Sequence, residues 1–291
     1  MNRRRQHSNQ SAPHASQRGA AMVIVLGLVL LLSIIAMAHA QNSRLETALT
    51  SRHLAAAESR HIADAAIELA IQDLLASLDE HRIPTDGQPV SIHVLGHQAV
   101  VSTRPAAGLV DLNTARESTL RSLFQWAGVE RDRAIALAAA VIDWRDLDGS
   151  MTLSGAEDET YIAAGRPWSA RDGAFINTDE LRYVMGMDIS TFTRISPYLT
   201  VYSGQAGIDL STAPRELVEA LTTNTTPART GPIRNRGGVF HINASVIGRD
   251  GIFVSAEVVV STRGGKDSAF EVLSRRDRSV SLAVAHKEAQ S

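Results

Sequence analysis

Residues 17–32, QRGAAMVIVLGLVLLL, decide how the chain begins, because an arginine and a glycine lead directly into an apolar run. Residues 20–38 contain no Asp, Glu, Lys, Arg or His, and these 19 positions approach the roughly 20 that a helix needs to cross the hydrocarbon core of a bilayer. Residues 1–19 carry four arginines and no acidic residue. The positive-inside rule therefore predicts a cytoplasmic N-terminus followed by a single membrane span.

The residues after the apolar run favour a continuous helix over a cleaved secretory signal. The small residues at 38–40, AHA, would suit signal peptidase, but the apolar region of a signal peptide usually has only about 7–15 residues. Residues 41–78 contain no Gly or Pro and are rich in good helix formers. One apolar stripe at helical spacing comprises Ala63, Ile67, Ile71, Leu74 and Leu78. We predict one helix over residues 20–78, transmembrane at 20–38 and amphipathic beyond.

The remainder of the chain predicts an antiparallel sheet interrupted by helices. Residues 90–101 and 239–262 each alternate around a turn, as β-hairpins do, and a further strand is expected near Phe270. The frame Asp-Leu-(Asn/Ser)-Thr-Ala occurs at residues 111–115 and again at 209–213. Each copy predicts a strand end that turns into a capped helix, with Asn113 or Thr114 as the first cap.

These patterns together predict an α+β fold in which a long N-terminal helix packs on an antiparallel sheet that holds a large helical insert. The expected divisions are a leader at 1–19, the helix at 20–78, the first part of the sheet at 79–110, the helical insert domain at 111–198, and the remaining sheet with the C-terminal segment at 199–291.

The N-terminal pattern resembles the type IV pilins and pseudopilins, which share a short basic leader, a glycine and a charge-free helix. The resemblance implies that a prepilin peptidase cuts between Gly19 and Ala20 and that the new N-terminus is methylated. The family usually has Glu at the fifth mature position, where this chain has Ile24. A buried Glu is costly unless it is paired. In pilins its partner is taken to be the amino terminus of the subunit ahead, which a tip subunit lacks.

Ordered motifs in the body resemble pseudopilin K of type II secretion over nearly the whole chain. They are VDLNTA, IDWRDLDG, GAEDETY, INTDELRYVMGM, PYLTVY and IDLSTAP, with Ser211 where the family would have Asn. The resemblance implies a pilin-like subunit at the pseudopilus tip, anchored in the bacterial inner membrane by one pass with a periplasmic body. The implied partners are other minor pseudopilins of the tip complex, prepilin peptidase, the inner-membrane secretion platform and secreted cargo.

An acidic cluster in the insert predicts a calcium site. Its members are Asp143, Asp146, Asp148, Glu157 and Asp158. Hard oxygen ligands on a turn with glycines suit Ca²⁺, although the spacing is not that of an EF-hand. A solvated acidic turn is the alternative interpretation.

A membrane-anchored DNA receptor is the alternative function, because residues 110–141 also resemble a helix-hairpin-helix. A hairpin that presents backbone amides to phosphate favours paired glycines, and only Gly128 is present. Beyond the leader, 25 basic and 31 acidic side chains give a formal charge of −6, which disfavours nucleic acid. The sequence has no cysteine, no nucleophile-elbow frame and no His-Glu-x-x-His, so we expect no enzyme.

Overall fold

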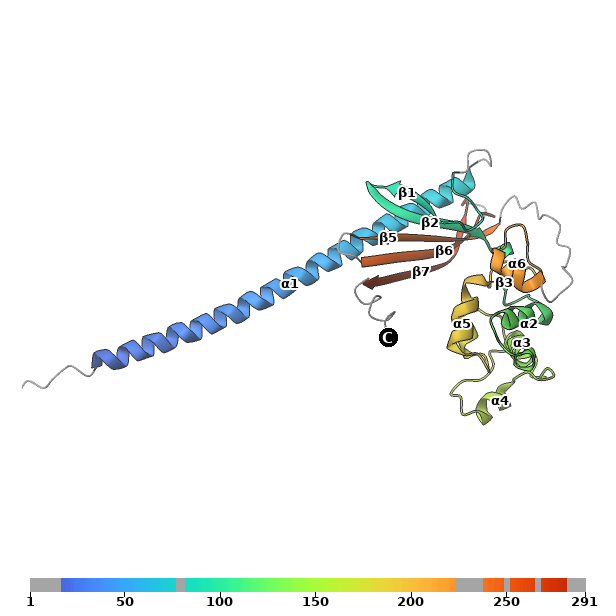
Figure 1. Cartoon of the computed structure of the whole chain (residues 1–291), viewed down its shortest axis with the longest axis horizontal. Coiled ribbons are helices and arrows are strands. Elements are labelled where there is room, and N and C mark those ends of the chain that lie inside the picture. The colour runs from blue at the N-terminus through green and yellow to red at the C-terminus, as the bar shows by residue number, and fades with distance from the viewer. Residues whose placement is uncertain (1–16, 77–81, 223–237, 249–251, 265–267, 282–291) are drawn as a thin grey trace, which may run out of the picture. The chain divides into compact units, whose positions relative to one another are not determined.

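Figure 1 shows the computed structural model, which describes residues 17–76, 82–222, 238–248, 252–264 and 268–281. The chain divides into two units, residues 1–55 and residues 56–291. Helix α1 (Gln17–Leu75) starts in the first unit and ends in the second, close to the bounds predicted from the sequence.

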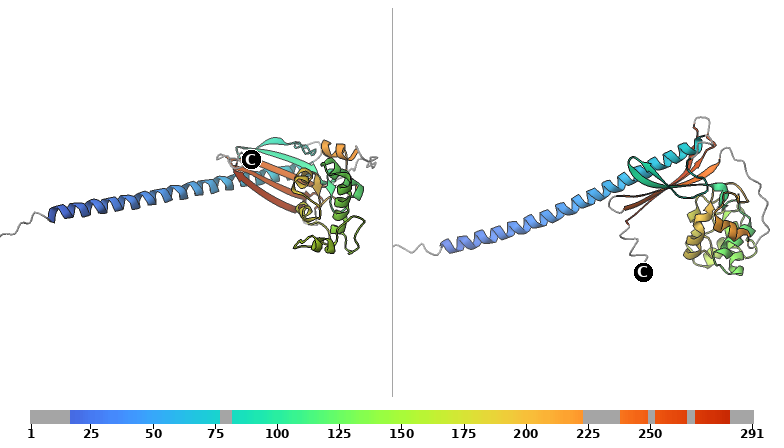
Figure 2. Two further views of the ribbon diagram at one scale, coloured as in Figure 1. Left: turned by 60° about the horizontal axis from the view of Figure 1, so that its bottom comes forward. Right: turned by 45° about the horizontal axis from the view of Figure 1, so that its top comes forward.

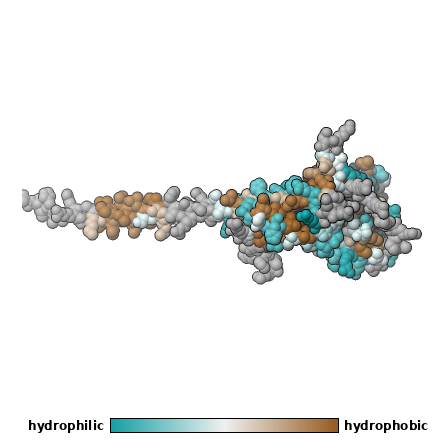
Figure 3. Space-filling model, turned by 90° about the horizontal axis from the view of Figure 1, so that it is seen from above, coloured by the Kyte–Doolittle hydropathy of each residue, from teal (hydrophilic) through white to brown (hydrophobic). Residues whose placement is uncertain are grey.

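In the described residues, the first unit is the N-terminal part of α1, and the apolar side chains of residues 22–37 are exposed. The large apolar residues between Met22 and Met37 are each 54–75% exposed, and Figure 3 shows them as a brown band. Within the described residues, no helix combines the length and the apolar character that crossing a membrane requires. The span expected at 20–38 is therefore not confirmed.

In the second unit, the C-terminal part of α1 packs on a five-stranded antiparallel sheet of order β1-β2-β5-β6-β7. The strands are β1 (Val90–Val94), β2 (His97–Pro105), β5 (Val239–Ile247), β6 (Ile252–Ser261) and β7 (Glu271–Ser281). Of the predicted helix stripe, Ala63, Ile67 and Ile71 are buried against this sheet and Leu74 is partly buried. Leu78 lies outside the described residues. Both predicted hairpins and the strand near Phe270 are present.

The helical insert is closed by two short parallel strands whose pairing the sequence did not predict. Strand β3 (Val110–Asp111) pairs with β4 (Leu199–Thr200), which brings the two ends of the insert together. Between and beyond them lie η2 (Ala106–Gly108), α2 (Glu117–Trp126), α3 (Arg131–Arg145), α4 (Asp158–Ala163), η3 (Thr178–Tyr183), α5 (Ile189–Ile195), η4 (Ser196–Tyr198) and α6 (Arg215–Thr222). Figure 2 shows these helices, coloured green to orange, in one cluster.

The core of this cluster continues past the expected boundary at residue 198. Ile208 and Leu217 are buried together with Leu120, Phe124 and the other apolar residues of the insert. The second repeat therefore packs with the helices, because its amphipathic helix α6 turns its apolar side toward α2 rather than toward the sheet.

The predicted caps of the first repeat are wrong, because the leading aspartate supplies the local acceptor. Helix α2 starts after Arg116, which makes no side-chain cap, while Asp111 accepts the backbone N–H of Asn113 at 2.8 Å. In the second repeat Asp209 accepts the N–H of Ser211 at 3.0 Å. Asp209 also donates its N–H to the carbonyl of Ala107 in η2 at 2.8 Å, so the second repeat contacts the turn that precedes the first. Both copies are thus the same Asp-led turn.

A histidine ties the insert to the sheet. His241 of β5 places Nε2 3.0 Å from the hydroxyl of Thr200, which is fully buried on β4. Its Nδ1 lies 3.2 Å from the carboxylate of Glu257 on β6. Hydrogen bonding from His241 is the largest cause of the lowered pKa of Glu257. This chain of contacts holds one end of the insert against the sheet.

Candidate functional site

The predicted processing site lies at the start of α1. Helix α1 begins at Gln17, so the bond between Gly19 and Ala20 falls in its first turn. Ile24 is 69% exposed and therefore available to neighbouring chains. The cleavage and the tip-specific role of Ile24 stay predictions.

Two of the predicted acidic ligands are used by the protein itself. Asp143, at the end of α3, is fully buried and accepts the N–H groups of Thr152 at 3.1 Å and Ala156 at 2.8 Å. The hydroxyl of Thr152 also donates to it. Asp148 is exposed and accepts the N–H of Ser150 at 2.9 Å. Both carboxylates therefore shape the loop between α3 and α4.

The acidic cluster contains a residue that the sequence did not reveal. Carboxylate oxygens of Glu157, Asp158 and Asp172 lie within 4.8 Å of one another. Asp172 comes from a later loop and adopts a left-handed backbone with φ of 52°, as Asp tolerates in turns. Its only signal in the sequence is the Asp-Gly pair at 172–173, which predicts a turn and not a ligand.

The electrostatics of this cluster favour a cation. Burial, followed by repulsion from Asp143 and Asp146, raises the pKa of Glu157 to about 7. Glu157 is only 8% exposed, and its Oε1 is buried without a hydrogen-bond partner among the described residues. Asp146 likewise has a buried, unpartnered oxygen and a pKa raised by burial and by neighbouring carboxylates. A divalent cation would supply the missing partner.

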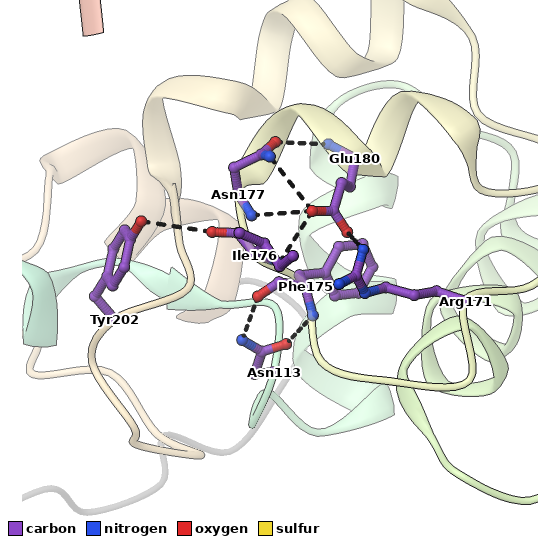
Figure 4. Close-up of polar contacts among 7 residues, drawn as sticks. All are labelled: Asn113, Arg171, Phe175, Ile176, Asn177, Glu180 and Tyr202. Atoms are coloured by element: carbon purple, nitrogen blue, oxygen red, sulfur yellow. Dashed lines mark hydrogen bonds and ion pairs between the residues drawn. The ribbon is translucent and has the colours of Figure 1, made fainter. Parts of the chain in front are cut away.

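The loop that carries Asp172 is held in place by a network around Asn113, shown in Figure 4. The side-chain amide of Asn113 donates to the carbonyl of Phe175 at 3.0 Å and accepts its N–H at 2.7 Å. Asn177 and Glu180 form a capping box at the start of the 3₁₀ helix η3. Residues 113 and 175 are distant in sequence. These two hydrogen bonds therefore fix the loop that carries Asp172 against the first repeat.

Helices α2 and α3 form the predicted hairpin. The backbone N–H groups at the start of α3, which could bind an anion, are already capped by a side chain of the protein itself. Gly128 adopts φ of 93° between α2 and α3, as the hairpin requires. The Glu130 carboxylate caps α3 by accepting the N–H groups of Asp132 at 3.2 Å and Arg133 at 3.3 Å. The Arg133 guanidinium pairs with Asp188 at 2.7 Å. An incoming phosphate would have to displace Glu130, which disfavours the DNA-receptor alternative.

Comparison with known proteins gives consistent matches. Residues 100–204 match the family described as type II secretion system (T2SS), protein K. The chain is 28% identical over 208 residues to type II secretion system protein K of Pectobacterium carotovorum subsp. carotovorum, covering 63% of this chain and 62% of that protein. The corresponding protein of Klebsiella pneumoniae is 38% identical over 77 residues, 26% of this chain and 24% of that protein.

The fold also matches a solved structure. In the crystal structure of the GspK-GspI-GspJ complex from the enterotoxigenic Escherichia coli type 2 secretion system, one chain aligns with a TM-score of 0.58 and 19% identity, covering 79% of this chain and 99% of that chain. The aligned stretch spans less than two thirds of the Pectobacterium relative. Residues 100–204 therefore match the type II secretion system protein K family, the curated relatives carry that name, and the chain shares its fold with a chain of the GspK-GspI-GspJ complex.

Proposed function

We propose that the protein is a minor pseudopilin at the tip of the periplasmic type II secretion pseudopilus, where it initiates or caps assembly and supports protein export. The observation that carries the proposal is the helical insert, which is inserted between β2 and β5 of an otherwise continuous sheet. Such a head makes the subunit broader than a helix and sheet alone. Its role is assembly and not catalysis.

The sheet register gives a clean test of the head. Pro105 of β2 pairs with Phe240 of β5, so replacing residues 106–239 by a two-residue Asn-Gly turn keeps the strands in register as a hairpin. We expect the shortened chain to reach the membrane while pseudopilus length or number changes and secretion falls. Unchanged pseudopili with full secretion would contradict the capping role. Membrane level and circular dichroism are the controls for folding.

The N-terminal helix is proposed as an inner-membrane anchor that later packs in the filament. The exposed apolar side chains between Met22 and Met37 support this role. We further propose cleavage between Gly19 and Ala20 by prepilin peptidase, followed by methylation. Mass spectrometry of protein from membranes of a host with that peptidase should give a chain starting at Ala20. A start at Gln41 would indicate a signal peptide, and an intact Met1 a simple anchored protein.

The proposed partners are the other minor pseudopilins of the tip complex, together with the inner-membrane secretion platform. The support is the fold shared with a chain of the GspK-GspI-GspJ complex. Co-expression with the two corresponding minor pseudopilins of the same organism should yield a complex that survives size-exclusion chromatography. Separate elution of the three proteins at micromolar concentration would contradict this partnership.

We also propose that Glu157, Asp158 and Asp172 hold calcium, with Asp146 close enough to raise the pKa of Glu157. Carboxylate oxygens are the ligands that Ca²⁺ prefers. The ion would neutralise a cluster whose mutual repulsion now destabilises the loop between α3 and α4. Calorimetric titration of the EDTA-treated full chain with CaCl₂ should show one saturable site that Asp172→Asn weakens. No heat, or an unchanged affinity in that variant, would contradict this assignment.

A further inference from the structure

The loop between α3 and α4 exposes large apolar side chains. Leu147 is 87% exposed and Leu153 is 91% exposed, and Met151 between them is 59% exposed. Ile162 on the outer side of α4 is 70% exposed, while its neighbour Tyr161 is fully buried. The apolar core of the insert is therefore complete without these four residues, which we call the apolar loop patch.

The patch is presented by a loop with a fixed internal geometry. The buried Asp143 carboxylate accepts backbone N–H groups from Thr152 and Ala156, which flank Leu153. The sulfur of Met151 lies 3.8 Å from the hydroxyl of Thr160, which links the loop to α4. A pre-ordered apolar surface loses little conformational entropy when a partner covers it.

The surroundings of the patch are acidic. Asp148 and Glu159 are exposed in the same segment as the patch residues and lie outside the proposed calcium ligands. Arg145 is the one basic residue within residues 145–162. It is turned inward and donates to the carbonyls of Leu112 and Ala115. A partner surface with lysine or arginine around an apolar recess would complement this arrangement, and long-range attraction would speed its approach.

The small size of the patch indicates a partner that binds and leaves. Four side chains cover far less than the roughly 2,000 Å² or more that permanent assemblies bury. We propose that the apolar loop patch is a transient docking surface for an exported protein whose contact region is an apolar recess bordered by lysine or arginine. This inference depends on the proposed role in export, and it assigns one surface of the head to the cargo.

The test uses the full chain in a strain that lacks its own copy. Leu147→Ser with Leu153→Ser removes the two most exposed apolar groups without touching the core, and Ile247→Ser, 66% exposed at the end of β5, is the matched control. We expect the double variant to lower secretion and the affinity for purified exported proteins of that host at least tenfold, with the control unchanged. Glu159→Lys should weaken binding, and added NaCl should weaken it further.

The outcomes separate the docking surface from the proposed function. Normal secretion and binding by the double variant, in a strain where replacement of residues 106–239 abolishes secretion, would overturn the docking surface and leave the pseudopilin role intact. Loss of co-purification with the other minor pseudopilins in the double variant would also overturn it, because the patch would then be an assembly contact. Failure of the wild-type chain itself to restore secretion would count against the proposed function.

Discussion

Replacement of Glu157 by Gln tests both the electrostatics and the metal assignment. The pKa of Glu157 is raised from 4.5 to about 7 by burial and by neighbouring carboxylates. The carboxylate is therefore disfavoured in the folded state. The protonated carboxyl group stabilises the folded state fully below pH 4.5, and this stabilisation is lost as the pH rises through about 7. Without metal, the wild-type protein should therefore be less stable at pH 8 than at pH 5.

The magnitude follows from the size of the pKa change. A rise from 4.5 to about 7 corresponds to about 3 kcal/mol, and exposure of Asp158 and Asp172 to solvent reduces this to about 1–3 kcal/mol. In EDTA at pH 8, Glu157→Gln should raise the free energy of unfolding by that amount, or Tm by about 2–4 °C per kcal/mol. At pH 4.5 and below, residue 157 is largely neutral in the folded state of both proteins. The difference in free energy of unfolding between the wild type and Glu157→Gln should therefore largely vanish. Added CaCl₂ should stabilise the wild type and not the variant.

The assay is thermal unfolding of the full chain followed by circular dichroism at both pH values, in EDTA and in CaCl₂. Glu159→Gln is the control, because Glu159 is exposed on α4 and lies outside the acidic cluster. A lower Tm for Glu157→Gln than for the wild type in EDTA at pH 8 would refute the repulsion argument. Equal stabilisation of both proteins by CaCl₂ would refute Glu157 as a ligand.

Three further substitutions test the contacts that position the head. Asn113→Ala should cost about 2–3 kcal/mol in urea unfolding, because two hydrogen bonds to the Phe175 backbone are lost; a loss under 0.5 kcal/mol would contradict the clamp. Gly155→Ala places a methyl group on the Asp143 carboxylate and should cost about 1–3 kcal/mol, and an unchanged Tm would contradict that packing. His241→Ala should cost about 1–2 kcal/mol and increase protease cleavage at the β4 end of the insert, whereas unchanged protection would exclude a tie between insert and sheet.

The elements that the sequence predicted correctly are those whose signal is local. A stripe at helical spacing gave α1, and period-two alternation gave the hairpins β1–β2 and β5–β6. The capping box at Asn177 was also predictable, because its partner Glu180 lies three residues away. The helix cap predicted at Asn113 or Thr114 was wrong, because these side chains donate instead to the carbonyls of Phe175 and Gln205, far along the chain.

By itself, the sequence determined the resemblance to pseudopilin K, the long apolar helix with its basic leader, and the acidic segment between residues 143 and 158. Only the tertiary structure decided which carboxylates meet. The Asp143 carboxylate accepts a backbone N–H group of the loop between α3 and α4, whereas Asp172, from a later loop, lies beside Glu157 and Asp158. Only the fold paired β3 with β4 and packed α6 with the insert. The physical reason is that burial and pairing depend on which distant segments come together, and no local period in the chain encodes that.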